Sequence, residues 1–80
     1  MFWEGRGVMA NLNFYAITYR TKLGRSVIIT TYDFDAVKKK TLSLFKQKLR
    51  ATIHRDGVVI GKVFKDETQR VGFNWELNHE

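Results

Sequence analysis

The chain contains no cysteine and no proline. The absence of cysteine excludes disulfide bonds and zinc sites built on thiolate ligands. A domain this small that lacks disulfides is typical of a reducing compartment, so we expect it in the cytoplasm, of a cell or of an infected host. Internal repeats and low-complexity linkers are missing as well.

Long hydrophobic runs are also missing. No apolar stretch approaches the length of about 18 residues that a membrane-spanning helix needs. The first eight residues, MFWEGRGV, include Glu4 and have no long apolar core, so they lack the pattern of a signal peptide. We therefore expect no membrane partner.

Eighty residues are enough for one hydrophobic core and too few for two. The hydrophobic content of 44% and the aromatic content of 14% can supply that core. Residues 1–10 contain two glycines and no clear period, which predicts a loose lead-in. Residues 11–80 are predicted to form a single small α+β domain.

Two stretches before residue 33 and three after residue 50 alternate apolar and polar residues as β-strands do. Asp56-Gly57 is the strongest turn signal, because this dipeptide suits the type I′ turn of tight hairpins. Gly61 lies inside a strand pattern and suggests a bulge or a close approach of backbones. The predicted strands are residues 12–21, 26–32, 51–55, 58–65 and 70–77, and the last should direct Val71, Phe73, Trp75 and Leu77 inward.

At Asp33 the spacing of the apolar residues changes from every second residue to every third or fourth, which predicts an amphipathic helix. Asp33 or Asp35 can cap its N-terminus. The apolar stripe of this helix comprises Phe34, Val37, Thr41, Leu44, Phe45 and Leu49. The resulting order is β-β-α-β-β-β, an antiparallel sheet with one amphipathic helix packed on one face.

Acidic residues are absent from this helical stretch after its first turn, whereas basic residues are concentrated there. The net charge of the whole chain is +6. Positive charges gathered on one helix face repel one another, and this favours an anionic partner. Six of the fourteen basic residues lie between Asp33 and Arg50, namely Lys38, Lys39, Lys40, Lys46, Lys48 and Arg50.

Bases of this density can neutralise phosphates without reading base identity. Exposed aromatic side chains would add stacking on single strands, with Tyr15, Tyr19, Tyr32 and Trp75 as candidates if one sheet face is open. The competing interpretation is a solvated lysine face and aromatics that belong to the core. The residues predicted to bind nucleic acid or an acidic partner are Lys38, Lys39, Lys46 and Arg50 on the helix, Arg20, Lys22 and Arg25 at the first turn, and Arg55 at the second.

Catalytic and metal-binding patterns are weak. His54 and Asp56 are two residues apart and could pair as a base and its orienting acid, but a strand residue beside a turn residue is the simpler interpretation. Asp33 and Asp35 could ligate a divalent metal, but helix capping explains them more simply. We therefore expect neither catalysis, nor a cofactor, nor a metal.

The sequence favours a small basic binding protein, which contacts nucleic-acid phosphates through the lysine-rich helix and the hairpin turns. The alternative is a protein-binding inhibitor or adaptor, of which a phage-encoded anti-defence or host-takeover factor docking on a nucleic-acid-handling machine would be one form. One side of the sheet has only a partner or the N-terminal residues to cover it. A homodimer formed through that face or through an edge strand is therefore a further expectation.

Overall fold

The computed structural model describes residues 13–78, so the predicted lead-in over residues 1–10 lies outside the described part. The order of elements is β-β-α-β-β-β, which confirms the predicted α+β architecture. The elements are β1 (Tyr15–Arg20), β2 (Ser26–Thr31), α2 (Phe34–Lys46), β3 (Ala51–Arg55), β4 (Val58–Lys65) and β5 (Phe73–Leu77).

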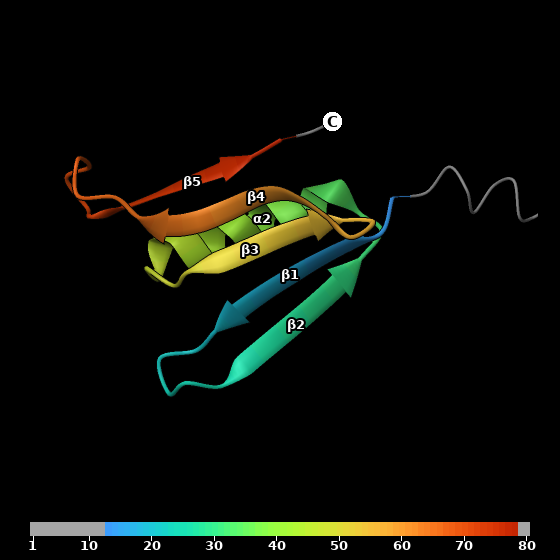
Figure 1. Cartoon of the computed structure of the whole chain (residues 1–80), viewed down its shortest axis with the longest axis horizontal. Coiled ribbons are helices and arrows are strands. Elements are labelled where there is room, and N and C mark those ends of the chain that lie inside the picture. Colours follow the sequence, from blue (N-terminus) through green and yellow to red (C-terminus); the bar gives the residue numbers. More distant parts are fainter. Residues whose placement is uncertain (1–12, 79–80) are drawn as a thin grey trace, which may run out of the picture.

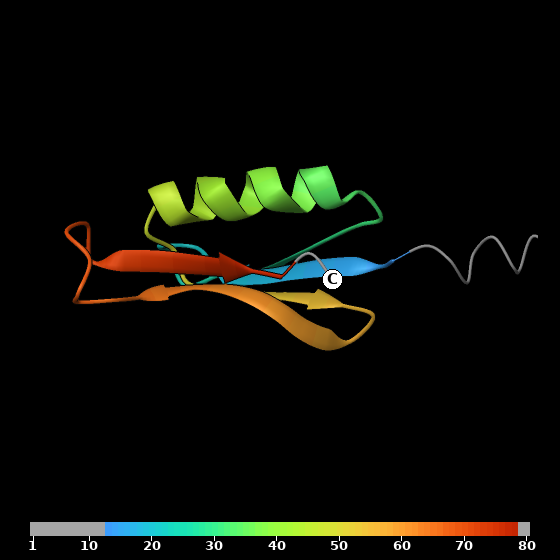
Figure 2. The same ribbon diagram turned by 90° about the horizontal axis from the view of Figure 1, so that it is seen from above.

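The five strands form one antiparallel sheet in the order β2-β1-β3-β4-β5 (Figure 1). The helix α2 covers one face of this sheet, as Figure 2 shows from the side. Within residues 13–78 the opposite face, called here the open face, carries no second layer. No helix in this part of the chain is long and apolar enough to span a membrane.

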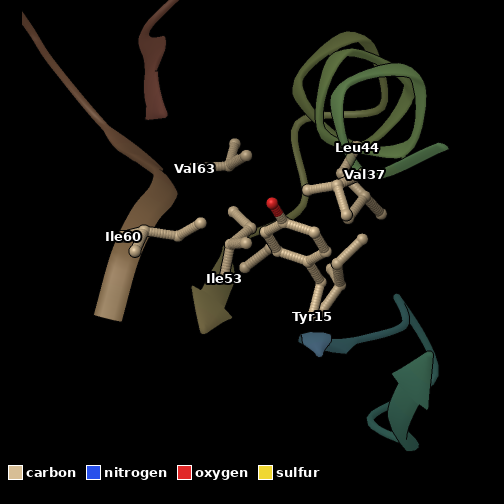
Figure 3. Packing of buried hydrophobic residues seen from close by; sticks show 8 residues of the cluster. Tyr15, Val37, Leu44, Ile53, Ile60 and Val63 are labelled. Carbon is tan, nitrogen blue, oxygen red and sulfur yellow. The ribbon is translucent and has the colours of Figure 1, made fainter. Parts of the chain in front are cut away.

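The core lies between α2 and the covered face of the sheet (Figure 3). Val37 and Leu44 of the helix and Ile53 of β3 are completely buried. Thr41 is also completely buried, and its hydroxyl donates to the Val37 carbonyl at 2.8 Å, which satisfies this buried polar group. The alternation along the strands thus directs one set of apolar residues, Ile53 among them, toward the helix.

Hydrogen bonds fix both ends of α2. The Asp33 carboxylate accepts from the Asp35 N–H at 3.0 Å, so Asp33 is the N-cap. At the other end Leu49 N–H donates to the Leu44 carbonyl at 3.0 Å in a Schellman-type closure. The helix therefore ends at Lys46, and the prediction that Leu49 continues its stripe is wrong, because Lys48 takes a left-handed conformation with φ 58°.

Replacing Lys48 with glycine should stabilise the protein. A left-handed conformation costs a residue with a Cβ roughly 1–2 kcal/mol, and glycine avoids this cost while losing more backbone entropy. We expect Lys48→Gly to raise the free energy of unfolding by about 0.5–1 kcal/mol in a urea titration. Lys48→Ala removes the same charge but keeps the Cβ, so equal stabilities of the two variants would contradict the role assigned to the backbone.

The turn between β3 and β4 has the predicted type I′ conformation. Asp56 and Gly57 both have positive φ, at 50° and 86°. Asp56 also joins this turn to the start of β1, because its carboxylate accepts from Phe14 N–H at 3.1 Å and its own N–H donates to the Phe14 carbonyl at 2.8 Å. The second hairpin is thereby held against the first.

A β-bulge interrupts the pairing of β3 with β4, as the glycine inside β4 suggested. Ile53 pairs with Gly61 and His54 with Val59, so Ile60 is the additional residue. The bulge directs Ile60 into the core, where it is 5% exposed. Gly61 is required for close packing, because a Cβ at this position would lie 2.5 Å from the carbonyl oxygen of Glu76.

The last strand is shorter than the pattern predicted. β5 begins at Phe73, because residues 70–72 belong to a turn in which Gly72 has φ 81°. Val71 was expected to face inward and is 50% exposed, so that prediction is wrong. Phe73, Trp75 and Leu77 pack against the core as expected.

Candidate nucleic-acid interface

The outer face of α2 carries exposed lysines, as the sequence predicted. Lys39 and Lys46 are two turns apart and border the same shallow depression, which Leu42, Ser43 and Gln47 complete. Both side chains are therefore directed away from the sheet. The helix presents a short row of positive charge to solvent.

Two further lysines lie on opposite flanks of the helix. Lys38 is exposed and borders a groove with Trp75 and Leu77 on the β5 side. Lys40 is half-buried on the other flank, where its Nζ lies 5.2 Å from the centre of the Tyr19 ring. Lys38 is available to a ligand, whereas part of the Lys40 side chain packs on the aromatic ring.

Most of the other bases gather at one end of the molecule, where α2 ends and β1 turns into β2 (Figures 1 and 2). The register of β1 and β3, continued one position past Tyr19 and Ala51, brings Arg20 opposite Arg50. All of the side chains gathered here are exposed. This group, called the basic end, comprises Arg20, Lys22, Arg25, Lys46, Lys48 and Arg50.

The turn that carries Lys22 and Arg25 is held by its own hydrogen bonds. Thr21 N–H donates to the Arg25 carbonyl at 2.8 Å, and Gly24 N–H donates to the Thr21 carbonyl at 2.9 Å. Gly24 has φ 88°, as expected for the glycine of a three-residue hairpin loop with a G1 bulge. The two cations are therefore presented from a defined backbone.

Arg55 does not belong to this group. It precedes the β3–β4 turn at the opposite end of the sheet, beside Asp56 and on the same side as Asp33 and Asp35 at the start of the helix (Figure 1). Antiparallel β1 and β3 end at opposite ends of the sheet, which separates Arg55 from Arg20. The end that holds Asp33, Asp35 and Asp56 is called the acidic end.

Sequence reasoning counted Lys48 among the bases of residues 33–50 but left it out of the predicted site. The structure adds it to the basic end, because the left-handed turn after Lys46 carries the chain from the helix back to β3. The apolar period continues from Phe45 to Leu49, so it gave no signal of the helix end. Glycine, the usual residue at the left-handed position after a helix, would have marked that end, but Lys48 stands there instead.

The loop between β4 and β5 brings Asp66 and Glu67 to the end of the fold where the basic end lies, but on the side of β5. The side-chain and backbone donors of Thr68 lower the pKa of Asp66 from its ordinary value of 3.8, with a smaller contribution from Asn74. Asp66 is therefore charged at neutral pH. Its contribution to stability is present above pH 3.8 and is lost as the pH falls through the lowered pKa.

Most of the predicted stacking aromatics are not accessible. Tyr15 is only 3% exposed and packs on Phe34 with ring centres 5.6 Å apart, which excludes stacking on a base. Tyr19 lies beneath Lys40, and Trp75 is half-buried on the helix side. Tyr32 is the exception, since it is 53% exposed.

Tyr32 contacts Phe14, another exposed aromatic residue, with ring centres 5.4 Å apart. The cross-strand pairing of Ala16 with Thr30 places both rings on the open face. They lie at the end of β1 opposite the basic end. Exposed aromatics and the densest positive charge are therefore separated along the fold.

The weaker catalytic and metal patterns find simple structural roles. His54 is a half-buried strand residue, and the Asp56 carboxylate accepts a backbone hydrogen bond from Phe14. Asp33 caps the helix. Across residues 13–78 no group of three or more His, Cys, Asp or Glu side chains is placed to hold a metal ion.

No protein-family model matches this chain, and no curated protein or solved structure is significantly similar to it. Function is therefore inferred from the geometry and charge of the residues themselves.

Proposed function

We propose that this chain is a non-catalytic nucleic-acid-binding protein, which contacts phosphates through the basic end and the outer face of α2. The separation of charge along the fold carries this proposal. The first hairpin, the helix C-terminus and the segment leading into β3 all contribute bases to one end, whereas Asp33, Asp35 and Asp56 lie at the other. Asp66 and Glu67 share the first end but lie on its β5 side, away from the first hairpin. Such a charge distribution orients a protein toward a polyanion during diffusion.

The arrangement of the arginines supports binding more than folding. Arg20 and Arg50 come opposite each other at the end of the sheet, and like charges in this position destabilise a strand pair. Lys46 and Lys48 do favour the helix, because they complement the negative end of its dipole. The two arginines have no such structural benefit, and a row of phosphates would relieve their repulsion.

Binding of this type is expected to be strong at low salt and indifferent to base sequence. The test is a fluorescence-anisotropy titration with short labelled single-stranded and double-stranded DNA and RNA, at about 50 and about 200 mM salt. We expect measurable binding at the lower salt and a steep loss of affinity at the higher. A folded protein that binds none of the four probes at low salt would contradict the proposal.

The helix contribution is tested by the variant Lys38→Glu/Lys39→Glu/Lys46→Glu. All three side chains are exposed, so the fold should persist while the phosphate-facing charge reverses. We expect an affinity loss of at least tenfold at about 50 mM salt, because three favourable phosphate interactions become repulsive. Far-UV circular dichroism of the variant provides the control for folding.

The open face supports a second candidate function, a protein-binding inhibitor or adaptor that docks on a nucleic-acid-handling machine. Ile28 and Val59 are 67% and 57% exposed on this face. An apolar sheet surface of this kind is typical of protein interfaces. The test is co-purification of a partner protein after nuclease treatment. A partner that is lost with Val59→Lys, but retained with the helix variant, would favour this function over the first.

A further inference from the structure

The edge strand β2 has none of the features that normally prevent strands from pairing with other chains. Residues 26–32, SVIITTY, contain no charged residue and no proline. The pairing of β2 with β1 runs without a bulge. Natural edge strands are usually protected by charges, prolines or bulges, so β2 is open to the addition of another strand.

The backbone groups available on this edge follow from the hairpin. Thr21 N–H donates to the Arg25 carbonyl, so Thr21 and Arg25 form a hydrogen-bonded cross-strand pair, whose backbone groups point toward each other. Bonded and non-bonded pairs alternate along antiparallel strands, so every second residue of β2 directs its N–H and carbonyl away from β1. Those residues are Ser26, Ile28 and Thr30, and no hydrogen bond to their backbone groups occurs within residues 13–78.

The other edge of the sheet is protected. Asn78 N–H donates to the Ile60 carbonyl at 2.8 Å, so by the same alternation the Trp75 N–H points away from β4. That N–H donates to the side-chain oxygen of its neighbour Asn74 at 2.8 Å. β5 also carries the exposed charge of Glu76. Strand addition is therefore favoured at β2 and disfavoured at β5.

Charge complementarity identifies the partner strand. When β2 is paired antiparallel with a second β2 so that Ile28 lies opposite Thr30 of the second copy, Arg25, which precedes β2, comes to the same end of the strand pair as Asp33, which follows β2 of that copy. Both residues are exposed, and the twofold axis generates this proximity of opposite charges twice. The basic end of each chain then lies beside the acidic end of the other. We propose that β2 pairs antiparallel with β2 of a second copy of this chain, joining the two sheets into one.

This dimer has a consequence for the outer surface of the helices. A twofold axis perpendicular to the sheet keeps both copies of α2 on the same face, so their exposed lysines lie on one side of the assembly. A six-residue strand pair is a small interface, for which we expect a dissociation constant on the order of micromolar. The dimer is inferred independently of nucleic-acid binding and is testable without any nucleic acid.

The test is sedimentation equilibrium of the full chain from about 1 to about 500 µM, a range that brackets micromolar association. Ile28→Pro removes an outward N–H without removing any bond to β1, and Thr30→Lys places a charge beside the axis. Each should raise the dissociation constant at least tenfold, because every change occurs in both copies. Val59→Lys adds a lysine to the open face on β4, far from the edge, and should change the dissociation constant less than about threefold.

A monomeric wild-type protein over this whole range would overturn the proposal. Dimerisation that survives Thr30→Lys would overturn it too, as would dimerisation that is lost in Val59→Lys, which would assign the contact to the open face. Should Ile28→Pro fail to fold by circular dichroism, Thr30→Lys alone decides, because Thr30 is exposed and tolerates a surface substitution.

Discussion

The double variant Arg20→Glu/Arg50→Glu should bind nucleic acid about a hundredfold more weakly than the wild type at about 50 mM salt. The β1–β3 register, continued one position past Tyr19 and Ala51, places these two residues opposite each other within the basic end. Each reversal removes a charge-assisted phosphate contact and adds a repulsive charge in its place. Anisotropy titrations of one labelled oligonucleotide with both proteins measure the difference.

The matched control is Arg55→Glu, compared with the single variant Arg20→Glu; each changes the net charge by the same amount, and the pairing of Arg55 with Tyr15 places it five residues from Arg20 along the sheet. Screening at about 50 mM salt limits the reach of a charge to roughly 14 Å, and five strand residues span roughly 17 Å, so we expect the Arg55 variant to lose less than about fivefold. Both variants should remain folded in a urea titration. Equal losses in the two variants would show that net charge alone, and not the basic end, determines binding.

The substitution Gly61→Ala should lower the free energy of unfolding by about 2–3 kcal/mol. The added methyl group would lie 2.5 Å from the Glu76 carbonyl oxygen and 2.9 Å from Cδ1 of Leu77. The first of these atoms is backbone, so relief requires β4 and β5 to separate. Urea denaturation followed by tryptophan fluorescence measures the loss, and Trp75 on β5 reports on the strand that must move.

Gly57→Ala separates this effect from the conformational freedom of glycine. Gly57 has φ 86°, and a Cβ there would meet nothing within 4 Å. Its replacement should lower the free energy of unfolding by about 1 kcal/mol through the left-handed backbone alone. If Gly61→Ala lowers the free energy of unfolding no more than Gly57→Ala does, the close approach of β4 and β5 is contradicted.

Local signals were enough to predict the order of elements. The change of period at Asp33 located the helix, and Asp56-Gly57 located the tight turn that both positive φ angles confirm. The end of the helix and the start of β5 were misplaced because backbone conformation interrupts an apolar period that the sequence continues. Lys48 adopts a left-handed conformation usually taken by glycine, and Gly72 holds Val71 in a turn.

The candidate site was predictable only where it lies on a single element. The exposure of Lys39 and Lys46 follows from helical spacing alone. The juxtaposition of Arg20 with Arg50 depends on β1 lying beside β3 and on their register, which pairs Tyr19 with Ala51. No local pattern contains that information, and for the same reason Arg55 was grouped with bases at the far end of the sheet.

The slope of log affinity against log salt concentration tests the phosphate-binding role of the basic end most directly. Each phosphate contact contributes about 0.7–0.9 to the magnitude of this slope. Neutralising Arg20→Gln/Arg50→Gln should therefore reduce it by about 1.4–1.8, whereas Arg55→Gln should leave it nearly unchanged. Identical slopes for the wild type and the Arg20/Arg50 variant would show that the basic end does not contact phosphates.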